Sequence, residues 1–417
     1  MGFWETLAGL LTLTAVFAYL NHRWLHLPSS IGVMSVALVF SLSLVLLQGL
    51  GFDLTTPVRE LLDRISFDTT LLHGLLGFLL FAGALSVDLT ELRREALPIA
   101  FLSTLGVLIS TLAVGGGAYA MLGWIGQAEP FIDCLLFGAL ISPTDPIAVL
   151  ALLKRLGAAQ GLKARMAGES LFNDGVGVTL FLLLLAVHEQ SGSIDPVSAL
   201  LLFARETLGG ILFGILAGGL IARLLRGVDQ YTVEILLTLA LVSGGFTLAD
   251  HLDVSAPLAV VVSGLIIGHH GRNTMSQITR HHLDLFWHLL DEIFNSVLFV
   301  LIGLEVLMMH FQRLDVAVIL VLIPVVLAAR LLSVGLPYLL LHRRGQVSHV
   351  AFGVMVWGGL RGGLSVAMAL SLPTSTPRDL LVAATYGVVV FGLLLQGGSL
   401  SWLLRRAPIR DHLDPAA

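Results

Sequence analysis

Long apolar segments separated by short polar connections occupy nearly the whole chain. A helix needs roughly 20 apolar residues to cross about 30 Å of hydrocarbon, and about thirteen segments approach that length. We expect spans near residues 3–20, 31–48, 69–87, 96–122, 131–152, 163–187, 200–225, 231–250, 255–270, 285–308, 314–340, 348–372 and 379–404. The pattern therefore predicts an all-α polytopic membrane protein with about thirteen transmembrane helices.

Composition supports a lipid-facing exterior. The chain is 56% hydrophobic and only 12% charged, whereas an ordinary soluble domain is about 25% charged. A soluble fold could not cover that much apolar surface with the polar residues present. The single cysteine, Cys134, excludes a disulfide framework and every multi-cysteine metal site.

Basic residues predict the orientation in the membrane. With thirteen spans, the connections that share a side with the C-terminus carry Arg23, Arg93, Arg94, Lys154, Arg155, Lys163, Arg165, Arg223, Arg226, Arg272, Arg280, Arg343, Arg344, Arg405, Arg406 and Arg410. The other side carries only Arg59, Arg64, Arg205, Arg313 and Arg378. Because basic loops remain in the cytoplasm, we expect a cytoplasmic C-terminus, an external N-terminus and, from the compact form, a bacterial inner membrane.

Two of the expected spans contain helix breakers at mid-membrane. Residues 142–146 read Ser-Pro-Thr-Asp-Pro, and residues 358–363 contain four glycines around Leu360 and Arg361. Irregular backbone at membrane depth is tolerated only where it lines a protein cavity. Broken spans at corresponding positions of two halves indicate a transporter site between inverted-topology repeats. We therefore expect the two broken helices to cross in the core.

Ionisable residues within spans are costly to place there, so each is a functional candidate. Asp145 lies in the first break, and Glu169 and Asp174 lie early in the sixth span. Asp174 is about 140° around the helix from Glu169, so the two carboxylates should have different roles. We expect Glu169 to form a structural ion pair with Arg330. Asp145 could alternatively be a helix N-cap.

Other charged positions favour structural roles. Arg361, in the glycine-rich break, is expected to neutralise carbonyls at the helix ends. A cytoplasmic loop and the start of the tenth span contain His269, His270, His281, His282 and His288. Their spacing does not require a zinc site, so a solvated basic loop is favoured, with a proton sensor left open.

The broken spans carry a resemblance to a known family. Ser-Pro-Thr-Asp-Pro at 142–146 and Gly-Glu-Ser-Leu-Phe-Asn-Asp-Gly at 168–175 resemble paired motifs of electroneutral sodium/proton exchangers of the NhaP type. The similarity continues through residues 298–305 and 358–365. It implies one exchanger domain over 1–417, with a moving core (about 96–187 and 314–404), a dimerisation scaffold (about 3–87 and 231–308) and a linker span (about 200–225). It also implies a homodimer.

The resemblance further implies residue roles. The residue matching Asp174 binds cation or proton, and the residue matching Asp145 assists. Oxygens come from the matches of Thr144 and Ser170, while the match of Glu169 pairs with an arginine like Arg330 beside the match of Asn173. Many relatives have an acidic residue in the third span, where this chain has Ala82.

These features predict a secondary active antiporter, not an enzyme. Na⁺, or alternatively Li⁺ or K⁺, would compete with H⁺ for the Asp174 and Asp145 carboxylates, since burial favours the neutral carboxyl group. By resemblance, Asn173 in place of a second aspartate predicts one-for-one, electroneutral exchange. No cofactor and no nucleic-acid partner is expected. The alternatives are a K⁺/H⁺ antiporter and, from another class, a cation channel.

Overall fold

The computed structural model describes residues 3–52, 54–63, 70–155, 157–189, 196–271, 275–309, 313–342 and 349–406. The regular secondary structure of the described residues is entirely helical, and they form no strand. Arg64, Arg272, Arg343, Arg344 and Arg410, which contributed to the predicted orientation, lie outside the described residues.

The first half of the chain, through the linker span, contains α1 (Phe3–Leu20), α2 (Ser29–Gly49), α3 (Thr56–Asp63), α5 (Leu76–Ser86), α6 (Leu89–Arg94), α7 (Ala96–Ser103), α8 (Leu105–Trp124), α9 (Phe131–Ile141), α10 (Ile147–Arg155), α11 (Gln160–Glu189) and α12 (Pro196–Leu225). The second half contains α13 (Tyr231–His251), α14 (Ala256–Ile266), α15 (Gln277–Glu305), α16 (Arg313–His342), α17 (His349–Trp357), α18 (Gly363–Leu370), α19 (Arg378–Phe391) and α20 (Gly397–Arg406). Short π-helical turns at 21–25, 70–75, 267–271 and 392–396 adjoin these helices.

Helix occupies each range in which a span was expected, so the all-helical class is confirmed. Among the described residues, 8 helices are long and apolar enough to cross a membrane, with shorter apolar helices at 76–86, 131–141 and 256–269. The number of thirteen spans stays a prediction.

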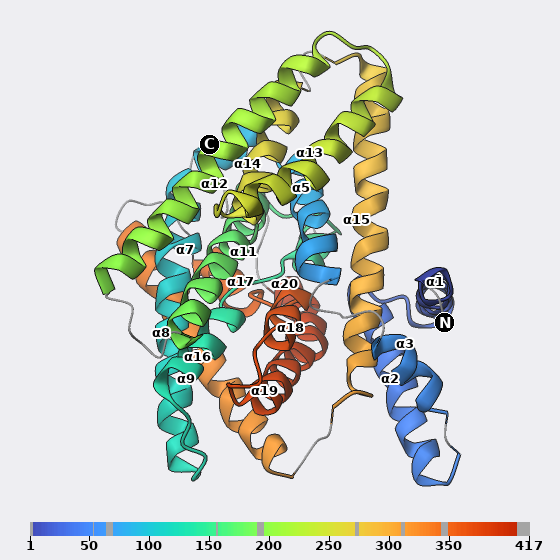
Figure 1. Ribbon diagram of the computed structural model, residues 1–417, viewed down its shortest axis with the longest axis vertical. Coiled ribbons are helices and arrows are strands. Elements are labelled where there is room, and N and C mark those ends of the chain that lie inside the picture. Colours follow the sequence, from blue (N-terminus) through green and yellow to red (C-terminus); the bar gives the residue numbers. More distant parts are fainter. Residues whose placement is uncertain are drawn as a thin grey trace.

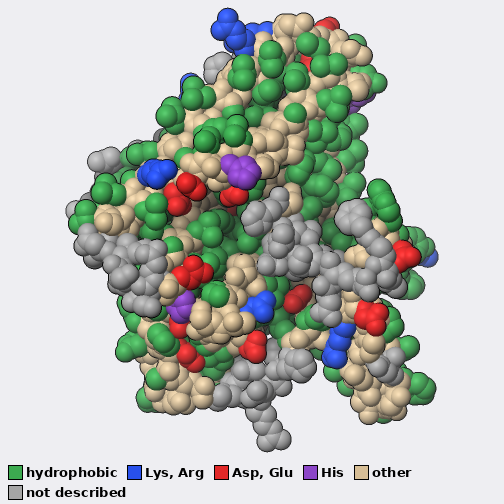
Figure 2. All heavy atoms as spheres, in the orientation of Figure 1, with side chains coloured by type: hydrophobic (Ala, Val, Ile, Leu, Met, Phe, Trp, Pro, Cys, Tyr) green, Lys and Arg blue, Asp and Glu red, His purple; other side chains and the backbone are tan. Residues whose placement is uncertain are grey.

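The exterior is apolar, as a lipid-facing surface requires. Hydrophobic side chains cover much of the face in Figure 2, and charged ones are sparse. On α12, Leu208, Leu212, Leu216 and Leu220 recur at helical spacing, and each exposes 58–65% of its surface. A continuous exposed leucine stripe of this kind is unusual on a soluble monomer, and lipid would cover it.

Helices from distant parts of the chain pack together. In Figure 1, α8, α9 and α16 lie side by side, and the long α15 stands beside α1 and α2. A Cβ on Gly138 of α9 would collide with the backbone of Thr111 on α8. Small residues let membrane helices approach this closely.

Both predicted breaks interrupt helices. The first separates α9 from α10 over residues 142–146, and the second separates α17 from α18 over residues 358–362. The extended segments meet in one antiparallel bridge, in which the Asp145 N–H donates to the Leu360 carbonyl at 2.8 Å. The broken helices therefore cross in the core.

Candidate functional site

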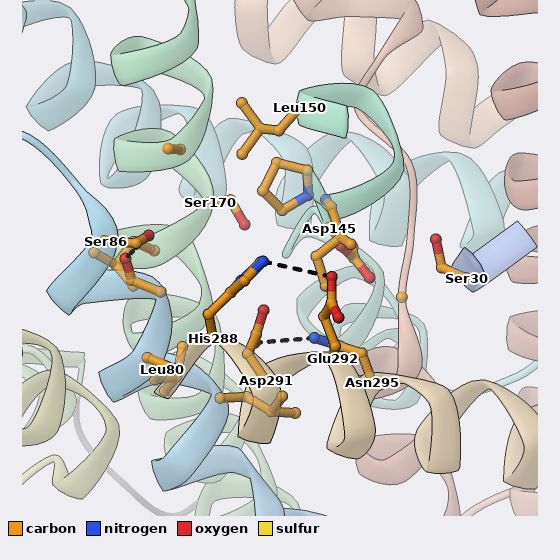
Figure 3. Close-up of a pocket in the computed structure, with 18 of the residues that line it drawn as sticks. Ser30, Leu80, Ser86, Asp145, Leu150, Ser170, His288, Asp291, Glu292 and Asn295 are labelled. Carbon is orange, nitrogen blue, oxygen red and sulfur yellow. Dashed lines mark hydrogen bonds and ion pairs between the residues drawn. The ribbon is translucent and has the colours of Figure 1, made fainter. Parts of the chain in front are cut away.

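A cavity of about 790 Å³ reaches the crossing of the broken helices. Its walls come from α5, α10, α11, α15 and α18 together with the first break. Figure 3 shows Asp145 and Ser170 facing the α15 side chains His288, Asp291, Glu292 and Asn295 across this space. Cation ligands can thus be drawn from several elements at once.

Asp174 lies in the cavity wall on α11 and is partly exposed to the space. Among the described residues, no hydrogen bond or ion pair to its carboxylate is found. A carboxylate that binds no protein donor is available to a cation or a proton. Asp145 lines the same cavity, so the two carboxylates share this space.

Asp145 caps a helix and also lines the cavity. Its Oδ1 accepts the Ile147 N–H at 2.9 Å, so it caps the start of α10. The residue also lines the cavity, and no hydrogen bond to its second carboxylate oxygen is found among the described residues. One oxygen therefore stabilises the break while the other remains available to a ligand.

Asn173 and Ser170 hold the first break from the neighbouring helix α11. Asn173 Nδ2 donates to the Thr144 hydroxyl at 2.9 Å, and Thr144 N–H donates to Asn173 Oδ1 at 3.4 Å. Ser170 Oγ donates to the Thr144 carbonyl at 2.5 Å. The backbone groups freed by the prolines thus find partners, as buried polar groups require. Both hydroxyls are engaged in this support.

Glu169 and Arg330 form a buried ion pair at 2.6 Å, with the two side chains 3% and 8% exposed. Glu169 therefore points away from the cavity, on a different face of α11 from Asp174. Arg330 also donates from Nη2 to the Met355 carbonyl at 2.8 Å and from Nε at 3.2 Å. The pair joins α11 to α16 and caps the end of α17, a capping role that the sequence did not indicate.

Arg361 lies in the second break and is 3% exposed. Its Nη1 donates to the Gly359 carbonyl at 2.8 Å, while its Nε has no partner among the described residues. The carbonyl that it contacts belongs to the same break. No salt bridge joins it to an acid within the described part of the chain.

The structure places Ala82, the position at which the family resemblance led us to expect an acid in many relatives, in the cavity wall. Acidic residues instead come from α15, because Asp284, Asp291 and Glu292 line the same cavity. The sequence reasoning missed these residues, although Asp291 and Glu292 fall within the expected span 285–308. His281 and His288, assigned to a solvated loop and a span start, also line the cavity.

Comparison with known proteins gives consistent matches. Residues 11–406 match the family described as sodium/hydrogen exchanger, transmembrane. The chain is 50% identical over 409 residues to the Na(+)/H(+) antiporter NhaP of Pseudomonas aeruginosa, covering 96% of each chain. It is 33% identical to the Na(+)/H(+) antiporter NhaH of Halobacillus dabanensis, covering 92% of this chain and 96% of that one.

A solved structure has the same fold. The sodium proton antiporter MjNhaP1 from Methanocaldococcus jannaschii at pH 8 aligns with a TM-score of 0.75. The alignment covers 97% of this chain and 99% of that chain at 19% identity.

Proposed function

Because the chain belongs to the sodium/hydrogen exchanger family, we propose that it exchanges Na⁺ for H⁺ across a membrane through the carboxylates of Asp174 and Asp145. The assignment of residues rests on one observation. The Asp174 carboxylate, to which no described residue donates a hydrogen bond, lies in the cavity at the crossing of two broken helices. Hard cations prefer oxygen ligands, carboxylates above all. A proton competes for the same oxygens, so binding of one ion releases the other.

We propose alternating access, in which this structure has the cavity open to one side of the membrane. Lys154 and His281 line it, and both lie in regions that the basic residues assign to the cytoplasmic side. The cavity thus faces the cytoplasm of a bacterial inner membrane, with the N-terminus outside. Movement of the core helices relative to the scaffold would expose the aspartates to the other side. A homodimer built through the scaffold would keep that part stationary.

Acid-loaded proteoliposomes test the function. Na⁺, Li⁺ or K⁺ added outside should raise the internal pH in the wild-type protein, and Asp174→Asn should abolish the rise because the amide cannot exchange a proton. Glu189→Gln is a matched control, since Glu189 is exposed at the end of the same helix. Exchange by Asp174→Asn at the wild-type rate would refute the assignment, and cation flux without proton countermovement would indicate a channel.

Stoichiometry is tested in the same vesicles. Asn173 holds Thr144 and carries no charge, so each cycle is proposed to move one Na⁺ against one H⁺. Imposing an inside-negative potential with K⁺ and valinomycin should leave the exchange rate unchanged. A rate that follows the imposed potential would show net charge movement and contradict the one-for-one proposal.

A further inference from the structure

The wall of the cavity opposite the aspartates carries a polar stripe on α15. His281, Asp284, His288, Asp291 and Asn295 follow one another at intervals of three or four residues and all line the cavity. This spacing places them on one helix face. Leu289 and Ile293, on another face of the same helix, are 47–50% exposed. The polar face is therefore the one turned to the cavity, where it can contact water or ions.

Within this stripe, Asp291 is held in position by another member of the stripe, Asn295. Buried Asn295 donates from Nδ2 to Asp291 Oδ1 at 3.0 Å, which leaves the other carboxylate oxygen open to the cavity. Figure 3 shows both side chains on the α15 wall, facing Asp145. Asp145 and Asp291 line the same cavity from different elements, so the two carboxylates share one space. Two neighbouring carboxylates both remain charged most readily when a cation lies between them.

The position that lacks an acid adjoins this stripe. Ala82 lies on α5, and the neighbouring Phe81 ring packs at 4.6 Å from the ring of Trp287 on α15. Asp291 is one helical turn beyond Trp287 on α15 and lines the same cavity as Ala82. A carboxylate on α15 can therefore reach the space into which an acid at position 82 would project.

An independent observation points to a ligand. Ser365, in the first turn of α18, lines the cavity and is 1% exposed. Its hydroxyl has no hydrogen-bond partner among the described residues. A buried hydroxyl without a partner costs free energy, so it implies a partner that the protein atoms do not supply. A monovalent cation or its bound water would satisfy the oxygen.

We propose that Asp291 is a third carboxylate ligand in the cation path and replaces the acid absent at Ala82, with the Ser365 hydroxyl as a further ligand. The inference rests on the proposed Na⁺/H⁺ exchange. Asp145 and Asp174 lie on the core, whereas Asp291 lies on the scaffold, so the cation is held between the moving and stationary parts. Asp291 then contributes only while the cavity is open on its own side.

The test measures the KM for Na⁺ and the kcat of exchange separately, in right-side-out and in inside-out membrane vesicles. Asp291→Asn should raise the KM for Na⁺ about tenfold from the side on which the cavity opens, because ligand charge tunes cation affinity over decades. From the other side the KM should stay at the wild-type value. The matched control is Glu189→Gln, which removes the same charge from an exposed position at the end of α11 outside the cavity lining, and its KM should stay close to wild type.

A second-site substitution that restores the KM distinguishes a ligand role of Asp291 from a structural role. Ala82→Glu in the Asp291→Asn background should restore the KM, because it returns a carboxylate to the same space from α5. Ser365→Ala should raise the KM less than Asp291→Asn. If Asp291→Asn does not fold, Ala82→Glu alone should lower the KM of the wild-type chain; an unchanged KM would count against the proposal.

Three results would overturn the inference while leaving the exchange function intact: an unchanged KM in Asp291→Asn, an equal rise in Glu189→Gln, or an equal rise from both sides. The second would show a general attraction of cations by acidic charge. Failure of the wild-type vesicles to exchange Na⁺ for H⁺ would instead overturn the proposed function.

Discussion

The two breaks that cross in the core both leave backbone groups without helical hydrogen bonds, and the side chains that satisfy these groups differ in charge. Residues 142–146 are held by neutral side chains, Asn173 and Ser170, and they present the Asp145 carboxylate to the cavity. At the second break, over residues 358–362, two guanidinium groups donate to backbone carbonyls. Arg330 donates to the Met355 carbonyl near the end of α17, and Arg361 donates to the Gly359 carbonyl within the break. Negative charge is thus kept on the ligand side, and positive charge compensates the free carbonyls of the second break. The crossing separates ion binding from structural compensation.

The largest effect is expected when the Arg330 guanidinium, which neutralises the buried Glu169 carboxylate, is removed. Arg330→Leu leaves Glu169 buried and unpaired, and breaking a buried pair in this way costs about 3–5 kcal/mol. The melting temperature in detergent should fall sharply, or the protein should fail to fold. Replacing both residues, as Glu169→Leu with Arg330→Leu, should recover most of the loss because no unpaired charge remains. A double variant as unstable as Arg330→Leu would show that the Met355 contacts of Arg330, and not the pair, dominate.

An intermediate effect is expected when the neutral support of the first break is removed. Asn173→Leu leaves the Thr144 hydroxyl and N–H without their partner, at a cost of about 1–3 kcal/mol for buried polar groups. The thermal melting temperature should fall less than for Arg330→Leu, and the exchange rate should fall because Asp145 is adjacent to Thr144. Asn173→Ser, which retains a short polar side chain, should be milder. Equal melting temperatures for wild type and Asn173→Leu would contradict this account.

The smallest loss of stability is expected where the breaks touch. A Cβ at Gly362 would overlap the Asp145 carboxylate and lie 2.7 Å from the Asp145 Cβ. Rotation of the side chain cannot move that Cβ, so one of the two breaks must shift slightly, and Gly362→Ala should cost about 1–2 kcal/mol, in the lower part of the range for overpacking. The displaced Asp145 should slow exchange several-fold, measured as proton flux in proteoliposomes. Gly353→Ala is the matched control, since a Cβ there meets nothing within 4 Å. If both variants exchange at the same rate, the orientation of Asp145 does not matter.

Much of this arrangement could be predicted from local sequence. Apolar segment length gave the helices, and prolines and glycines located both breaks, because these residues remove donors or flex the backbone regardless of context. The helical spacing of Glu169 and Asp174 predicted that the two carboxylates lie on different faces of α11. Tertiary proximity could not be obtained in this way. Asp291 lies within an expected span, but only the folded chain brings it opposite Asp145; the recurrence of polar residues at helical spacing along α15 was the available signal.

The single hydrogen bond between Asp145 N–H and the Leu360 carbonyl has a mechanical consequence. It ties the interrupted part of one broken span to that of the other, at a place where neither has helical hydrogen bonds. Bending one broken helix alone would break this hydrogen bond, so the link favours movement of the two breaks as one unit. The Asp145 amide should accordingly exchange its hydrogen for deuterium slowly throughout turnover, even though its side chain faces water.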